Sequence, residues 1–137
     1  MGERGWLRGI ALAGSTVIAL GLAASACSGD STQITTMSQW CKTYRSVGGI
    51  VFPDTPIDET RRAMDATATM YEDLSMSSVA DEVSDEAAAI AIVYRSASKM
   101  LERGESSDKA RSALLDSDVQ AATHAVSSFF DKNCVGY

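Results

Sequence analysis

Seven apolar side chains recur at alternating spacings of three and four, and this pattern constrains the fold more than any other feature of the sequence. They are Ala80, Val83, Ala87, Ile90, Tyr94, Ala97 and Leu101. Such spacing places all seven on one face of an α-helix. Ser78 is a suitable N-cap, and Gly104 follows Arg103 where a helix is expected to end. The pattern predicts a long amphipathic helix between Ser78 and Gly104, at the centre of an all-α fold.

Shorter patterns predict two helices before this one. Thr36 and Gln39 have capping-box spacing and open a first helix, whose apolar face is Met37, Trp40, Tyr44 and Val47. Thr55 and Pro56 suit the N-cap and first position of a second helix. Its buried face is expected to contain two threonines as well as apolar residues. The residues on this face are Ile57, Thr60, Met64, Thr67, Tyr71 and Leu74. We therefore expect the second helix to be the weakest-packed of the set.

The C-terminal third predicts a last helix that begins at Ser117. Ser117 and Gln120 have capping-box spacing, and one face carries Val119, Ala122, Val126 and Phe129. Residues 116–118 favour a break, although a continuous helix from about Ser107 also fits the stripe. Four helices with short connections predict a small antiparallel four-helix bundle, with an extra short helix around residues 107–115 as an alternative.

The three cysteines, Cys27, Cys41 and Cys134, are an odd number for a secreted chain. If Cys27 is modified, Cys41 and Cys134 remain as a pair near the two ends of the domain, and an antiparallel bundle brings those ends together. A disulfide between them would raise the free energy of unfolding by on the order of 4 to 5 kcal/mol in the chain-entropy model. A metal site is disfavoured because His124 is the only histidine and falls off the apolar stripe. We expect no metal and no cofactor.

The N-terminal segment is typical of a secretory signal peptide. Arg4 and Arg8 precede a charge-free run over residues 10–26. As a helix this run spans about 26 Å, short of a hydrocarbon core of about 30 Å, so cleavage is favoured over a permanent anchor. The small pair Ser25-Ala26 before Cys27 favours lipoprotein processing. Ala24-Ser25-Ala26 is an alternative site for ordinary signal peptidase, which would release the protein.

The overall layout resembles the small helical lipoproteins of actinobacteria. The residues that carry the likeness are Ser25-Ala26-Cys27, a polar tether, Trp40-Cys41-Lys42-Thr43-Tyr44 near the mature start, and the closing Asn133-Cys134-Val135-Gly136. Ala24 departs from the pattern, since these proteins usually have leucine there. The resemblance implies an extracytoplasmic location on the outer face of the bacterial plasma membrane, with lipid on Cys27, and it implies no reaction.

These features predict a signal peptide at residues 1–26, a polar tether at 27–36 and a disulfide-stapled helical bundle at 37–137. The stapled end should face the membrane, and segments 48–54 and 104–116 should face away. After residue 26 the chain has 10 basic and 17 acidic residues, a net charge of −7. This charge repels nucleic acid and anionic lipid surfaces, so the expected membrane contact is through the lipid on Cys27 alone.

Two charged clusters are candidate ligand sites. The acidic quartet is Asp81, Glu82, Asp85 and Glu86. Its place early in the long helix is explained by the helix dipole, and weak binding of a divalent cation is the alternative. The basic set is Arg61, Arg62, Arg95 and Lys99. Such a set lines an anionic-ligand cleft in helical chorismate mutases, but only if the side chains converge from separate helices.

No catalytic residues are predicted, because the sequence contains no Gly-rich phosphate loop, no GxSxG and no Glu-x-x-His pair. Ile50, Val51 and Phe52 form an apolar patch that is either a lid on the core or a contact for a partner. We expect a membrane-tethered, non-catalytic interaction or scaffold module that contacts another envelope protein. The alternatives are an extracytoplasmic carrier of a small apolar ligand, a released secreted protein and, last, an enzyme.

Overall fold

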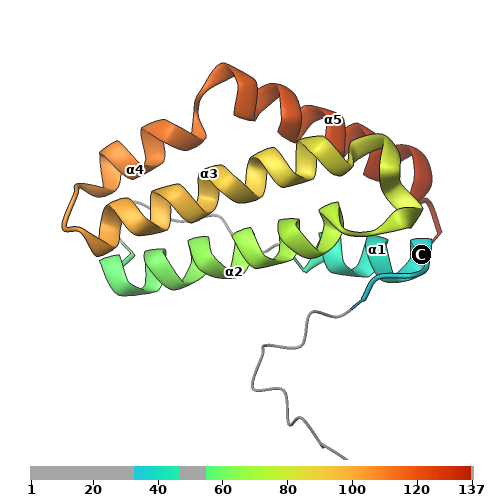
Figure 1. The fold of residues 1–137 in the computed structure, drawn as a ribbon, viewed down its shortest axis with the longest axis horizontal. Helices are drawn as coiled ribbons and strands as arrows, with labels where there is room; N and C mark the ends of the chain where they lie inside the picture. Colours follow the sequence, from blue (N-terminus) through green and yellow to red (C-terminus); the bar gives the residue numbers. More distant parts are fainter. Residues whose placement is uncertain (1–32, 47–54, 137) are drawn as a thin grey trace, which may run out of the picture.

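The computed structural model describes residues 33–46 and 55–136, and the fold of this part of the chain is all-α (Figure 1). Its elements are α1 (Met37–Arg45), α2 (Ile57–Ser75), the 3-10 helix η1 (Ser78–Val83), α3 (Ser84–Glu102), α4 (Ser107–Leu114) and α5 (Ser117–Asn133). No strand occurs within these ranges. The predicted all-α class is therefore confirmed. The predicted signal peptide and Cys27 lie outside the described residues.

Helices α2 and α3 form an antiparallel hairpin, and α4 and α5 pack on the other side of α3 (Figure 1). The alternative short helix near residues 107–115 is present as α4. Helix α1 has only nine residues and contacts α2 and α5 at one end of the hairpin. The described residues therefore do not show four long helices packed along one another. None of the helices in them is both long and apolar enough to cross a lipid bilayer.

The stripe between residues 80 and 101 is buried as predicted, except that Tyr94 is only partly buried. The prediction of one continuous helix is wrong. Residues 78–83 form η1 instead, and the backbone is non-helical at Ala80 (φ −135°, ψ 39°). The cap is Ser77 rather than Ser78, because the Ser77 hydroxyl accepts a hydrogen bond from the amide of Val79. The same hydroxyl donates to the carbonyl of Ile34 at 3.1 Å, which holds this turn against the start of the domain.

Two predicted helix ends are confirmed at the level of hydrogen bonds. At the start of α1, Thr36 Oγ1 accepts from the amide of Gln39, and Gln39 Oε1 accepts from the amide of Thr36. At the end of α3, Gly104 adopts φ +81°, a left-handed conformation that favours glycine. The amides of Gly104 and Glu105 then donate to the carbonyls of Leu101 and Met100, both at 3.0 Å. This Schellman arrangement turns the chain back towards α4.

The expectations for α2 are wrong in three respects. Thr55 does not cap the helix, which follows Pro56 without a side-chain cap, and Ile57 is exposed. The helix is also not weakly packed, because it contacts α3 along its length and buries Met64, Tyr71 and Leu74. The alanines of the α3 stripe leave room for this close approach.

The predicted break between α4 and α5 is confirmed, but its predicted cap is wrong. The N-cap of α5 is Asp116, whose carboxylate accepts from the amide of Asp118 at 2.9 Å. Gln120 does not complete a capping box and instead donates through Nε2 to the carbonyl of Leu114 at 3.0 Å. The side chain of Gln120 thus satisfies a terminal carbonyl of α4, and the bend forms without that group being left unpaired.

The predicted disulfide between Cys41 and Cys134 is present, with a Cα–Cα distance of 5.6 Å, and joins α1 to the end of α5. Beside it, Trp40 is completely buried, stacks on Tyr44 and meets Phe129 edge-on. Ile34 is also buried in this core, so the packed region extends back into the segment predicted as a tether. A second, smaller core lies at the other end of the hairpin and contains Met64, Ala97, Leu101 and Ala110.

Candidate binding groove

An open groove of about 510 Å³ lies between α3, α4 and the start of α5. It lies beside the bend between α4 and α5, the highest point of the chain in Figure 1. Its lining is Ala89, Ile92, Val93, Ser96, Ser112, Ala113, Asp116, Asp118 and Val119. Most of this lining is apolar or small, and Ile92 has 69% of its surface exposed. The bend therefore leaves part of the α3 surface uncovered.

A second open hollow of about 370 Å³ lies between α3 and α5. It is lined by Asp85, Glu86, Ala89, Asp118, Ala121, Ala122 and Ala125. Because Ala89 and Asp118 line both hollows, the two form one continuous surface. We call this surface the acidic groove, since every charged residue in its lining is an aspartate or a glutamate.

The chemistry of the acidic groove comes from its carboxylates and its apolar side chains. The lining contains two hydroxyl groups, those of Ser96 and Ser112, but no histidine, cysteine, lysine or arginine. The floor is made of alanines, which leave room for a partner to approach closely. The groove can therefore offer apolar contact area and negative charge.

The structure divides the predicted acidic quartet. Asp81 and Glu82 lie in η1, whereas Asp85 and Glu86 lie in the first turn of α3 and line the acidic groove. The junction between η1 and α3 separates the two pairs, because Val83, the N-cap of α3, has φ −125° and ψ 17°, and the four residues therefore do not lie on one continuous α-helix. Over residues 33–46 and 55–136, no cluster of three or more His, Cys, Asp or Glu side chains could hold a metal ion.

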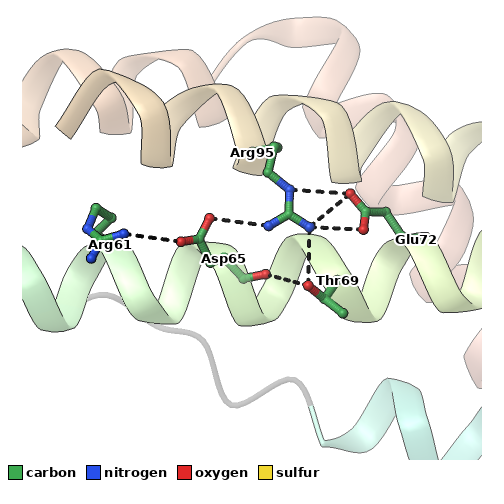
Figure 2. Close-up of polar contacts among 5 residues, drawn as sticks. All are labelled: Arg61, Asp65, Thr69, Glu72 and Arg95. Carbon is green, nitrogen blue, oxygen red and sulfur yellow. Dashed lines mark hydrogen bonds and ion pairs between the residues drawn. The ribbon is translucent and has the colours of Figure 1, made fainter. Parts of the chain in front are cut away.

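Two residues of the predicted basic set, Arg61 and Arg95, pair with carboxylates of α2 (Figure 2), whereas no ion pair of Arg62 or Lys99 is seen within the described residues. Arg95 on α3 makes a bidentate contact with Glu72, with both oxygens 2.9 Å from Nη2, and contacts Asp65 at 3.3 Å. Arg61 pairs with the same Asp65 at 3.5 Å. The pKa of Arg95 is raised, chiefly by its hydrogen bonds to Glu72. The contacts of Arg95 clamp α2 to α3, and both Arg61 and Arg95 are engaged by carboxylates.

Replacing Arg95 with glutamine should lower the free energy of unfolding by about 1 kcal/mol, since the contacts are multiple but remain partly exposed to solvent. The loss should shrink at high salt, because salt screens the ion pairs. Arg62→Gln is the matched control, since Arg62 is exposed and, among the described residues, its side chain donates to the Asp58 carbonyl of its own helix. Urea unfolding of both variants at low and high salt measures the difference. Equal losses in the two variants would show that the clamp contributes nothing specific.

Those of the remaining predicted residues that the structure describes do not line the acidic groove. His124 is exposed on α5, as predicted. Ile50, Val51 and Phe52 lie outside the described residues. Sequence reasoning missed the acidic groove, although one signal was present: Ile92 is a large apolar residue off the buried stripe of its helix.

Comparisons with models of known protein families, with curated proteins and with solved structures gave no match.

Proposed function

We propose that the protein is a lipid-anchored, extracytoplasmic interaction module that binds another cell-envelope protein through the acidic groove and catalyses no reaction. The observation that carries this proposal is the continuous open groove, with its alanine floor and exposed Ile92, on a domain closed by a disulfide. Exposed apolar surface that is rimmed by polar residues is typical of interaction sites.

The Cys41–Cys134 disulfide supports an extracytoplasmic location, since such bonds form and persist in oxidising compartments. It also accounts for two of the three cysteines and leaves Cys27 for the lipid that we propose. The chain between Cys27 and Ile34 can span at most about 25 Å. A lipid on Cys27 would therefore hold the stapled end of the domain close to the bilayer.

A carrier of a small apolar ligand is the second candidate, because the groove volume of about 510 Å³ lies within the range of volumes of small-molecule binding sites. The groove is open, however, and carboxylates border it, so an apolar ligand would keep much of its surface in water. A protein helix can cover the groove and pair with those carboxylates at the same time. The geometry therefore favours a protein partner.

The intact mass of the protein isolated from its native membrane tests the anchor. We expect a chain that begins at Cys27, carries a diacyl or triacyl adduct and has two fewer protons at Cys41 and Cys134. A chain that begins at Cys27 without an adduct, or one that retains residues 1–26, would contradict the anchor. The binding role of the groove is tested separately.

A photo-crosslinking side chain at Ser96 or at Ala121 tests the groove in intact cells. Both positions line it and are exposed. Ala66 is the matched control, since it is an exposed alanine on α2 that does not line the groove. We expect the same envelope protein to be crosslinked from Ser96 and Ala121 and not from Ala66. No adduct at the groove positions, or equal adducts at all three, would contradict the proposal.

A further inference from the structure

We infer that the segment bound in the acidic groove is a basic amphipathic helix of about three turns; this inference rests on the proposed function and names the chemistry of the partner. Three observations support it, namely the charge of the rim, the floor of the groove and the hydrogen bonding of the helices that form it.

The rim of the groove carries four carboxylates that form no ion pair within the described part of the chain. Asp85 and Glu86 lie at one end, and Asp116 and Asp118 border the start of α5. The basic side chains of α3 and α4 that form ion pairs do so elsewhere: Arg95 with α2, Arg103 and Lys109 with Glu105, and Arg111 with Asp108. A partner with lysine or arginine beside its apolar face would therefore meet carboxylates that are available for pairing.

The floor of the groove fits a helix better than an extended segment. Along α3 the lining runs from Asp85 to Ser96, which is about 16 Å or three helical turns. Alanines at 89, 121, 122 and 125 let a second helix approach closely. The walls are α-helices whose backbone groups already bond within each helix, so they offer no sheet edge to an extended peptide. A bound helix satisfies its own backbone, and an extended segment would leave backbone groups unpaired.

A second copy of this chain is a poor occupant. In a symmetric contact the same patch meets itself, so the four rim carboxylates of one copy would face those of the other. The chain as a whole is acidic, with a net charge of −6. Like charges at an interface suppress association. A heterologous basic partner is therefore favoured.

The test uses the purified full chain in a non-ionic detergent and labelled synthetic peptides as probes. The first peptide is a helix of about three turns with alanine and leucine on one face and lysines beside that face. The second has glutamate at each lysine position, and the third has the composition of the first with prolines that prevent helix formation. Fluorescence anisotropy measures binding. We expect the lysine helix to bind at least about tenfold more tightly than either of the others, and more weakly as salt is raised.

Two pairs of variants locate the binding. The double variant Asp85→Asn/Glu86→Gln should bind the lysine helix several-fold more weakly than the unchanged protein. The double variant Asp81→Asn/Glu82→Gln, which removes the same charge from η1, should bind it as tightly as the unchanged protein. Ala89→Arg should block the groove, whereas Ala66→Arg, the same change on α2, should not. Far-UV circular dichroism confirms that each variant is folded.

The inference is overturned if the glutamate or proline peptide binds as tightly as the lysine helix, or if the two charge-removing pairs behave alike. It is also overturned if Ala89→Arg converts a dimer of the full chain into a monomer, because the occupant would then be a second copy. If these results occur while Ser96 and Ala121 still crosslink an envelope protein in cells, the proposed function stands and only the nature of the partner is wrong.

Discussion

Replacing both Cys41 and Cys134 with alanine should lower the free energy of unfolding by on the order of 4 to 5 kcal/mol. The disulfide joins residues 93 positions apart, so its loss greatly increases the conformational freedom of the unfolded chain. Urea unfolding followed by far-UV circular dichroism measures the change. An effect below about 1 kcal/mol would contradict the chain-entropy argument.

The loss should be greatest around α1, because the disulfide joins this short helix directly to the end of α5. Other contacts of α1 include the buried Trp40 and the side chain of Arg45, whose guanidinium donates to the carbonyl of Cys134 at 3.2 Å and lies 5.4 Å from the centre of the Phe130 ring. Amide exchange over α1 should therefore rise more than exchange over the α2–α3 hairpin. Complete reduction of the unchanged protein is the control, and it should reproduce both effects.

Replacing Trp40 with alanine should lower the free energy of unfolding by about 3 to 5 kcal/mol, the usual cost of removing a large buried aromatic side chain. The indole ring is completely buried, stacks on Tyr44 at 5.6 Å between ring centres and meets Phe129 at 5.0 Å. Alanine would leave a cavity beside the disulfide that these neighbours fill only in part. Urea unfolding followed by circular dichroism is again the measurement.

Trp40→Phe is the matched control and should cost less than about 1.5 kcal/mol, because most of the ring contact is kept. The indole Nε1 has no hydrogen-bond acceptor within the described residues, so its removal breaks no bond there. If phenylalanine proves as destabilising as alanine, the stability of this core depends on the shape of the indole rather than on buried aromatic area.

Features that depend on neighbours along the chain could be predicted from the sequence. The stripe at residues 80–101 is one, because helical periodicity alone decides which side chains share a face. The capping box at Thr36 and the left-handed Gly104 are others, since both involve bonds within one turn. The helix starts were less well predicted. Ser77 and Asp116 replace the expected caps Ser78 and Ser117, because several serines and aspartates compete at each start.

The acidic groove and the Arg95 clamp could not be predicted in this way. Asp85 and Asp118 border one groove only because the chain bends between α4 and α5 and α5 packs on α3. Arg95 meets Glu72 only because α2 and α3 lie antiparallel in register. Both depend on which surfaces of different helices adjoin.

The sequence by itself determined the helical class and most of the face that each helix buries, because helical periodicity is a property of one segment. It indicated the pairing of Cys41 with Cys134 only on the condition that Cys27 is modified, since three cysteines allow three pairings. The tertiary structure alone decided which surface stays uncovered. That surface is the acidic groove, because it depends on the angle at which α4 and α5 cross α3 and on the small side chains that meet there.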